Sequence, residues 1–273
     1  MTVAIDLPRA RLPGAGSAGR FLANYLPATL LLVALVGFWE AWVQVRNTPS
    51  YVLPAPSLVW EAFLRTRGTL PGHTLTTLNE SLLGLGIGAL AGVALASLMT
   101  SVAIVRRVLY PLMIVSQTIP MIVLAPLLTI WFGFGIEPKV VVVLLVTFFP
   151  VLVSTTEALL GADRNLIALL QSMGATRLQT LRYVLLPSAL PGFFAGLRIA
   201  AAYAVTGAVI AELMGAQSGL GLYITRSNSA FRTDQVFVGI VLVALLSLAL
   251  FAAVHIINRL ATPWAFAGKG DNS

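Results

Sequence analysis

The chain has 273 residues, of which 58% are hydrophobic and 10% are charged, and its formal net charge is +7. Soluble domains carry roughly 25% charged residues, so this composition predicts a protein whose solvent is largely the lipid bilayer. The absence of cysteine excludes disulfides and thiolate metal sites. The two histidines lie far apart and make a poor metal set, so no metal site is expected. No basic run exceeds the pair Arg106–Arg107, which argues against a nucleic-acid partner.

Six apolar segments are long enough to cross a membrane as helices, because a span needs about 20 residues. In chain order they cover residues 24–45, 76–105, 108–131, 140–160, 190–214 and 236–257. No β-barrel alternation is visible, so the expected fold class is an all-α, polytopic membrane protein with six transmembrane helices. We expect residues 1–20 to be a flexible cytoplasmic tail, residues 21–263 a single transmembrane domain, and residues 264–273 a second cytoplasmic tail.

The distribution of basic residues predicts the orientation. With the N-terminus inside, eleven of the 17 Lys and Arg residues fall on the cytoplasmic side. Both termini and residues 161–187 are then cytoplasmic. Two outer segments are more than turns. One is an interfacial helix through Arg65 with Ser57 as its N-cap, and the other is residues 215–234, which are expected to return to the membrane surface.

The polar segment 161–187, between the fourth and fifth spans, has a helical pattern of its own. Asp163 can cap a first helix. Four apolar residues of this helix share one face: Leu166, Leu169, Leu170 and Met173. Such a face can dock on another protein or lie on lipid, and the periodicity leaves both possibilities open.

A second short helix is expected to follow at an angle to the first. Gly174 supplies a left-handed stop. Thr176 and Gln179 have the spacing of a capping box, and Pro187 is expected to end this helix. The two helices together would form a compact elbow, a name we use below for residues 161–187.

The spacing from Gly174 to Val184-Leu185-Leu186-Pro187 resembles the cytoplasmic loop signature of binding-protein-dependent ABC importer permeases. That signature reads EAA, three residues, G, nine residues, I-x-L-P. Here Ala168-Leu169-Leu170 stands in place of EAA, so the glutamate is missing, and Val184 replaces the isoleucine. The loss of the acid removes any salt bridge that it would carry, and it leaves the elbow intact.

Further motifs, spread over about residues 36–260, resemble the nitrate/sulfonate/taurine subfamily of these permeases. They are Leu53-Pro54-Ala55-Pro56-Ser57 with Trp60, Pro187-Ser188-Ala189-Leu190-Pro191 with Gly196-Leu197-Arg198, and Ala211-Glu212. Three others look most like permeases for thiamine-type pyrimidine precursors or riboflavin. They are Thr77-Leu78-Asn79-Glu80, Ser116-Gln117-Thr118-Ile119-Pro120, and Ala125-Pro126 with Trp131-Phe132-Gly133-Phe134-Gly135.

The resemblance implies an importer of the bacterial inner membrane, with two permease copies, two ATPase subunits and an extracytoplasmic binding protein. The elbow would couple to the ATPase through Ala168, Leu169, Leu170, Met173, Gly174, Ala175, Arg177 and Pro187. The chain has no G-x-x-x-x-G-K-[ST] phosphate loop. We therefore expect a transport subunit that is not an enzyme and holds no cofactor, with ATP and Mg on the partner ATPase.

Polar and aromatic residues within the third to fifth spans predict a substrate pathway. The set is Gln117, Thr118, Thr147, Phe148, Phe149, Tyr203, Thr206 and Glu212. Alternatively, the hydroxyls bond back to their own helices and the aromatic rings pack on lipid. Glu212 can serve gating or packing. Glu157 is expected to pair with Arg198 or with an arginine of a loop, and no role is assigned to Glu80 or Glu40.

Small residues recur every fourth position at Gly84, Gly88, Gly92 and Ala96, which predicts close helix packing within the subunit or across a dimer. Low charge within the spans favours a small, weakly charged ring as the solute, such as a thiamine pyrimidine precursor or riboflavin. Nitrate, sulfonate or taurine is the alternative. A stand-alone secondary transporter would need inverted repeats and an ion site, and it would leave the elbow unexplained. A membrane enzyme would need clustered acids or histidines.

Overall fold

The computed structural model describes residues 17–267, and every regular element between those residues is a helix. The chain divides into two compact units, Met1–Leu58 and Val59–Ser273. Five helices of the described part are long and apolar enough to cross a membrane, and one bent pair of helices is a sixth candidate. The tails predicted for residues 1–20 and 264–273 fall mostly outside the described residues.

The first unit contains helix α1 (Ser17–Val45), whose apolar part Leu26–Val45 is long enough to span. Ser57 does not cap the helix that follows, because α2 (Pro56–Thr66) begins one residue earlier, at a proline. Proline is favoured in a first helical turn, where its missing N–H is not needed. The Glu40 carboxylate serves as the cap instead, accepting from the Ser57 backbone N–H at 3.0 Å and from its hydroxyl at 2.8 Å.

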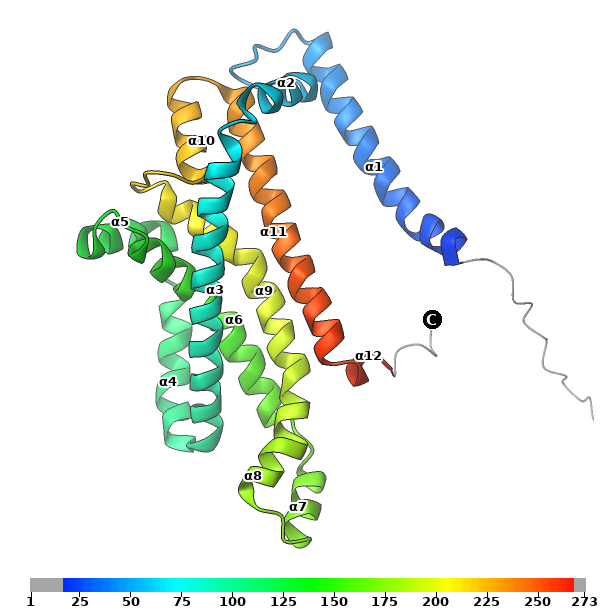
Figure 1. Ribbon diagram of the computed structural model, residues 1–273, viewed down its shortest axis with the longest axis vertical. Coiled ribbons are helices and arrows are strands. Elements are labelled where there is room, and N and C mark those ends of the chain that lie inside the picture. The colour runs from blue at the N-terminus through cyan, green and yellow to red at the C-terminus, as the bar shows by residue number, and fades with distance from the viewer. Residues whose placement is uncertain (1–16, 268–273) are drawn as a thin grey trace, which may run out of the picture. The chain divides into compact units, whose positions relative to one another are not determined.

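The second unit is built on three long helices, α3 (Leu70–Ser101), α6 (Glu137–Leu160) and α9 (Leu186–Glu212), with α11 (Thr233–Ala261) packed along α9 (Figure 1). The small residues of α3 face α6. A Cβ added at Gly88 would overlap the Thr147 hydroxyl, and one at Gly92 would press on the backbone of α6. The predicted packing role of the small-residue series is confirmed, and the contact lies within the subunit.

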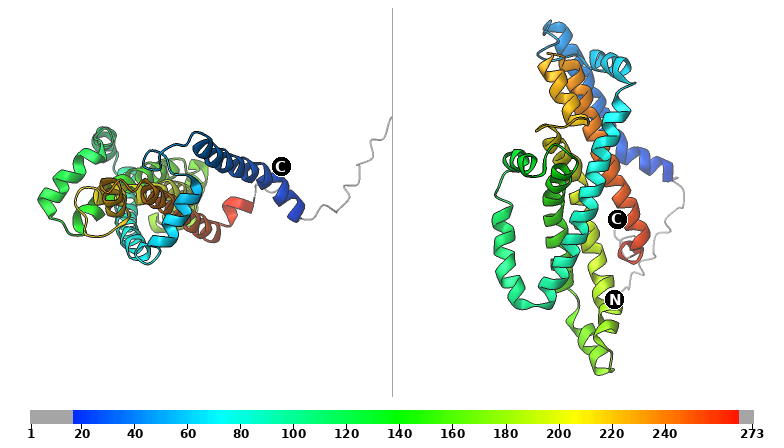
Figure 2. Two further views of the ribbon diagram at one scale, coloured as in Figure 1. Left: turned by 90° about the horizontal axis from the view of Figure 1, so that it is seen from above. Right: turned by 60° about the vertical axis from the view of Figure 1, so that its left-hand side comes forward.

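The prediction of one continuous helix for the third span, residues 108–131, is wrong. It is divided into α4 (Ala103–Ser116) and α5 (Met121–Phe132), and the two helices meet at 98°. Pro120 stands at the break in an extended conformation, with φ −62° and ψ 125°. Proline lacks the N–H that a continuous helix needs and clashes with the preceding turn. The pair is therefore a broken span or a re-entrant hairpin, as the right-hand view of Figure 2 shows.

The two ends of the second unit carry different short elements. At one end lie α7 (Arg164–Ser172), α8 (Arg177–Thr180) and the π-helical turn η1 (Leu181–Leu185), and at the other lies α10 (Leu220–Ser229) (Figure 1). A four-residue helix, α12 (Trp264–Ala267), follows α11.

Helix α10 lies in the segment that was expected to return to the membrane surface, and it packs on α11 and α9. Tyr223 is buried beside Ala62, Leu70 and Val238. Burial raises the pKa of the Tyr223 hydroxyl, which donates to the Thr66 hydroxyl at 3.2 Å. Contact of this segment with lipid stays a prediction.

Candidate functional site

The elbow has the capping interactions that its sequence predicts. The Asp163 carboxylate accepts from the Asn165 backbone N–H at 2.8 Å and caps α7. Gly174 adopts a left-handed φ of 77°, which ends that helix. A complete capping box then starts α8, because Gln179 accepts from the Thr176 N–H at 2.7 Å and Thr176 accepts from the Gln179 N–H at 3.3 Å.

The second helix of the elbow does not end at Pro187, which corrects the prediction. The π-helical turn joins α8 to α9, and Pro187 occupies the first turn of α9. The Leu186 N–H bonds to the Leu181 carbonyl, five residues back. This wider turn allows the chain to stay helical through the proline. Residues Arg177–Glu212 therefore form one helical rod that links the elbow directly to the membrane-spanning core.

The apolar face of the elbow is not covered by the rest of the chain. Leu169 is 55% exposed and Met173 is 75% exposed, and Leu178 of the second helix is 72% exposed. The other residues assigned to ATPase coupling are exposed or half-buried: Ala168, Leu170, Gly174, Ala175, Arg177 and Pro187. Large apolar side chains that remain exposed on a rigid helix pair favour contact with a partner.

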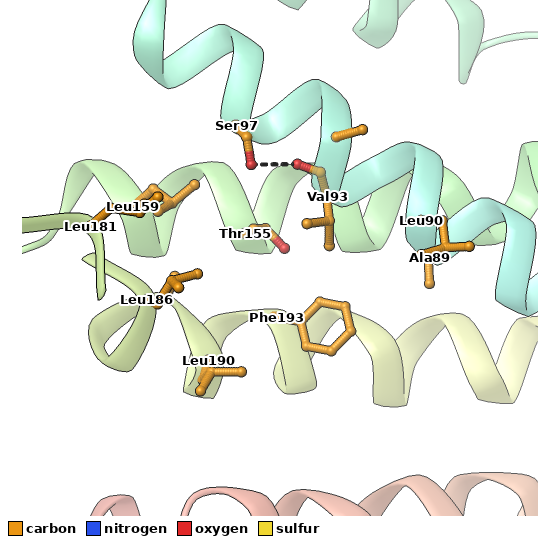
Figure 3. Close-up of a pocket in the computed structure, with 12 residues that line it drawn as sticks. Ala89, Leu90, Val93, Ser97, Thr155, Leu159, Leu181, Leu186, Leu190 and Phe193 are labelled. Carbon is orange, nitrogen blue, oxygen red and sulfur yellow. Dashed lines mark hydrogen bonds between the residues drawn. The ribbon is translucent and has the colours of Figure 1, made fainter. Parts of the chain in front are cut away.

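An apolar cavity of about 450 Å³ lies where the elbow joins α9 (Figure 3). Leu181 and Leu186 of the joint line it together with Leu159 of α6 and Phe193 of α9. The joint is therefore loosely packed on this side, whereas the middle of α9 is tightly packed through Ala200 and Ala204, which are fully buried.

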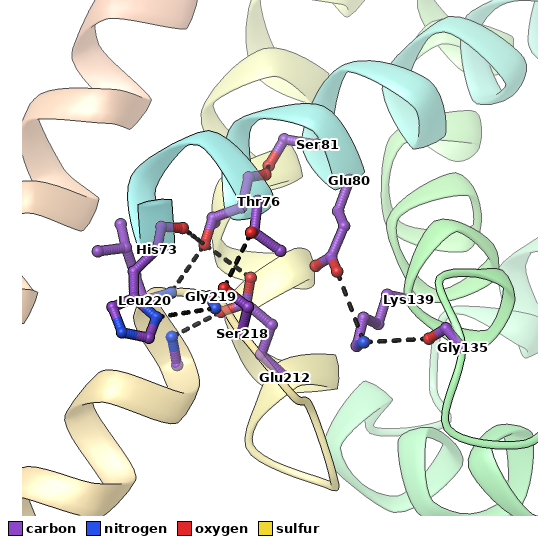
Figure 4. A network of polar contacts seen from close by, with 12 residues as sticks. His73, Thr76, Glu80, Ser81, Gly135, Lys139, Glu212, Ser218, Gly219 and Leu220 are labelled. Carbon is purple, nitrogen blue, oxygen red and sulfur yellow. Dashed lines mark hydrogen bonds and ion pairs between the residues drawn. The ribbon is translucent and has the colours of Figure 1, made fainter. Parts of the chain in front are cut away.

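A buried polar network lies toward the opposite end of the core (Figure 4). The Glu212 carboxylate, at the end of α9, accepts from the Thr77 hydroxyl of α3 and from the Gly221 backbone N–H, both at 2.6 Å. Two more N–H groups at the start of α10 are bound by α3, since Leu220 donates to the Thr77 hydroxyl at 2.9 Å and Gly219 to His73 Nδ1 at 3.1 Å. The carboxylate is thus held by one N–H group in the first turn of α10, at the helix end that favours negative charge.

Lys139 of α6 extends the same network. Its ammonium lies 3.6 Å from a Glu80 carboxylate oxygen and donates to the Gly135 carbonyl at 3.0 Å (Figure 4). Glu80 is 2% exposed and Lys139 is 7% exposed. No role was predicted for Glu80, and Lys139 lies one residue before the predicted span 140–160. Their positions at the edges of apolar segments were the available signal, because ionisable residues within spans are rarely left unpaired.

The structure does not bring the eight predicted pathway residues to one surface. Thr147 is fully buried between α3 and α6, and its hydroxyl donates to the Val143 carbonyl at 2.8 Å, so it has the back-bonded alternative arrangement. Phe148 is half-buried against the cluster around Met99. Glu212 belongs to the network described above. The placement of these three residues corresponds to packing within the chain.

The remaining pathway residues are more accessible. Gln117 and Thr118 are exposed at the break between α4 and α5, and Phe149 is half-buried. Tyr203 is 53% exposed and lies one turn before the exposed Thr206 on the same side of α9. None of these placements tests transport, so the pathway role of the eight residues stays a prediction.

The predicted pairing of Glu157 is wrong. Between residues 26 and 265 the structure contains two ion pairs, and neither includes Glu157. Arg198 approaches His255 instead, with Nη1 3.5 Å from Nδ1. Arg198 lies about three turns into α9, and its side chain is turned toward α11.

Comparison with known proteins identifies the family. The family described as the binding-protein-dependent transport system inner membrane component matches residues 84–264. The riboflavin transport system permease protein of Chloroflexus aurantiacus is 37% identical over 243 residues, 88% of this chain and 89% of that protein. The formylaminopyrimidine transport permease protein of Halalkalibacterium halodurans is 37% identical over 240 residues, covering 88% and 96%. The taurine transport system permease protein of Escherichia coli is 31% identical, covering 85% and 87%.

Solved structures show the same fold. The MetNI methionine ABC transporter in an inward-facing conformation gives a TM-score of 0.61 at 23% identity, over 70% of this chain and 94% of that one. An amino acid ABC transporter with histidines gives a TM-score of 0.57 at 18% identity, over 75% and 97%. The predicted all-α permease fold is confirmed, and the chain belongs to the family of binding-protein-dependent transport system inner membrane components, the permease subunits of ABC importers.

Proposed function

We propose that this permease works as a homodimer that couples, through the elbow, to two copies of a separate ATPase and receives its solute from an extracytoplasmic binding protein. The observation that carries the proposal is the exposed apolar face of Leu169, Met173 and Leu178 on a capped helix pair. ATP and Mg would bind to the ATPase subunits. The excess of basic residues in the segments 1–20, 106–107 and 161–187 supports an inner-membrane orientation with both termini cytoplasmic.

The continuous helix Arg177–Glu212 provides a path for coupling. Movement of the elbow, driven by the ATPase, would be carried by this helix because α8, the π-helical turn and α9 share one hydrogen-bonded backbone. Tyr203 and Thr206 lie on the same rod and would move with it. The pathway would then open alternately to each side of the membrane, and the permease itself would carry out no covalent chemistry.

Replacing Leu169 by Asp tests the docking face. The variant places a charge on the face proposed to be buried, so ATPase association should weaken by about 2–4 kcal/mol. Gln171→Asp is the matched control, since it adds the same charge to the exposed opposite side of α7. Co-purification of the ATPase with each variant, at equal membrane levels, is the measurement. Equal association of both variants would mean that this face does not contact the ATPase and lies on lipid.

We further propose that the solute is a neutral or weakly charged ring, such as a thiamine pyrimidine precursor or riboflavin. The two relatives that are 37% identical are named as permeases for riboflavin and for formylaminopyrimidine. The taurine permease is less similar, at 31% identity. An uptake panel with the cognate binding protein should include a thiamine pyrimidine, riboflavin, taurine and nitrate. Uptake of taurine or nitrate without a response to either ring would overturn the ring proposal and leave the permease assignment intact.

A further inference from the structure

A second pocket lies at the elbow end of the core, between α4 and α6, and its largely apolar lining also carries charged side chains. It has a volume of about 390 Å³. Arg106, Arg107 and Tyr110 of α4 line it on one side, and Thr156 and Glu157 of α6 line it on the other. None of these residues belongs to the predicted pathway or to the elbow, so neither role explains the pocket.

Among the described side chains, the charged groups of this pocket form no ion pair. The two ion pairs between residues 26 and 265 include neither arginine and do not include Glu157. The Thr156 side chain is 3% exposed, and its hydroxyl oxygen has no hydrogen-bond partner. A buried hydroxyl without a partner costs free energy, because it has lost its hydrogen bonds to water. A bound polar ligand would remove this cost, so the hydroxyl is independent evidence for an occupant.

The position of the pocket indicates which ligands can reach it. The arginines lie within two turns of the start of α4, and Glu157 lies within the last turn of α6. The corner between α3 and α4 is at the end of the unit from which the elbow extends further (Figure 1). Spanning helices end near the lipid head groups, and tyrosine is favoured at that depth. The pocket therefore lies where phospholipid head groups are concentrated.

We propose that this pocket binds a membrane phospholipid whose head group carries both a phosphate and a primary amine. Arginine guanidinium groups match phosphate oxygens in charge and geometry, so Arg106 and Arg107 would hold the phosphate and the Thr156 hydroxyl would donate to it. The Glu157 carboxylate would accept from the ammonium. A lipid with phosphate and no amine would leave Glu157 unpaired beside a negative charge, and free phosphate would gain nothing from the neighbouring Leu160 and Pro111.

Native mass spectrometry of the purified, delipidated full chain tests this site, and the transported solute does not affect the result. The probes are synthetic phosphatidylethanolamine, phosphatidylglycerol and inorganic phosphate. Phosphatidylethanolamine should bind at least about tenfold more tightly than phosphatidylglycerol. Arg106→Gln combined with Arg107→Gln should weaken the binding of both lipids. The control pair Arg226→Gln with Arg259→Gln, which removes two exposed arginines without ion pairs, should bind as the original chain does.

Two conservative variants keep the test decisive if the double arginine variant folds poorly. Glu157→Gln should abolish the preference for phosphatidylethanolamine. Thr156→Val, which is nearly isosteric, should weaken the binding of both lipids. A preference for phosphatidylglycerol, unchanged binding in the arginine and threonine variants, or displacement of the lipid by an equal concentration of inorganic phosphate would each overturn the proposal.

Discussion

The two ends of the core hold their polar groups in opposite ways. In the elbow, each capping interaction joins residues two or three positions apart, as in Asp163 with Asn165 and Thr176 with Gln179, and the groups are exposed. In the network at the other end, Thr77 and Glu212 are 135 positions apart, and both are buried. The elbow is thus a locally determined unit, whereas the network exists only when α3, α9 and α10 are all in place.

This difference indicates that the elbow can move, whereas the buried network holds the helices of the core in place. The elbow contacts the core mainly through the π-helical turn, next to an apolar cavity. The network joins α3, α6, α9 and α10 through ionisable groups that are excluded from water. Damage to the network should therefore destabilise the whole chain, and damage to the elbow should affect coupling while the core stays folded.

The largest effect is expected from Lys139→Met. The change leaves the Glu80 carboxylate buried without its cation, and breaking a buried ion pair in this way costs about 3–5 kcal/mol. The purified chain should unfold at a clearly lower temperature in a thermal denaturation series. Arg226→Met, which removes an exposed cation near the same end, is the control and should unfold as the original chain does.

A double variant sharpens this result. Glu80→Gln with Lys139→Met removes both charges, so much of the lost stability should return, because replacing a whole buried pair is often close to neutral. A Lys139→Met variant that unfolds at the original temperature would show that the network is not an anchor.

The success of the sequence-based predictions also depends on whether a contact is local, as in the elbow, or long-range, as in the network. The caps of the elbow, the left-handed Gly174 and the small-residue face of α3 depend on spacings of a few residues, and the structure confirms all three. The Glu80–Lys139 pair depends on how α3 and α6 are placed, which no local pattern specifies. Pro187 was misread because a proline that ends one helix and a proline in the first turn of the next have the same local sequence. Only the neighbouring π-helical turn distinguishes them.

An intermediate effect is expected from Gly174→Val, and it should be on coupling. An added Cβ would meet no atom within 4 Å, so the obstacle is the left-handed backbone and not space. The left-handed conformation costs a residue with a Cβ roughly 1–2 kcal/mol, and the cost is higher for a β-branched residue such as valine. Uptake should fall while membrane level and thermal unfolding of the core stay unchanged. Gly174→Asn is the control, because asparagine tolerates this conformation, and normal uptake by the valine variant would exclude the elbow from coupling.

The smallest effect is expected from Thr176→Ala, which removes half of the capping box. The Gln179 N–H loses its acceptor, and the loss of such a cap costs about 1 kcal/mol. Because Thr176 is exposed and its partner lies three positions away, the cost should stay within the elbow. Amide hydrogen exchange should become faster over residues 177–182 and remain unchanged in the middle of α9, around the fully buried Ala200 and Ala204. Thr176→Ser retains the hydroxyl and should show original exchange rates. If exchange also became faster in the middle of α9, the elbow and the core would unfold as one unit, and the distinction between a movable part and an anchored part would fail.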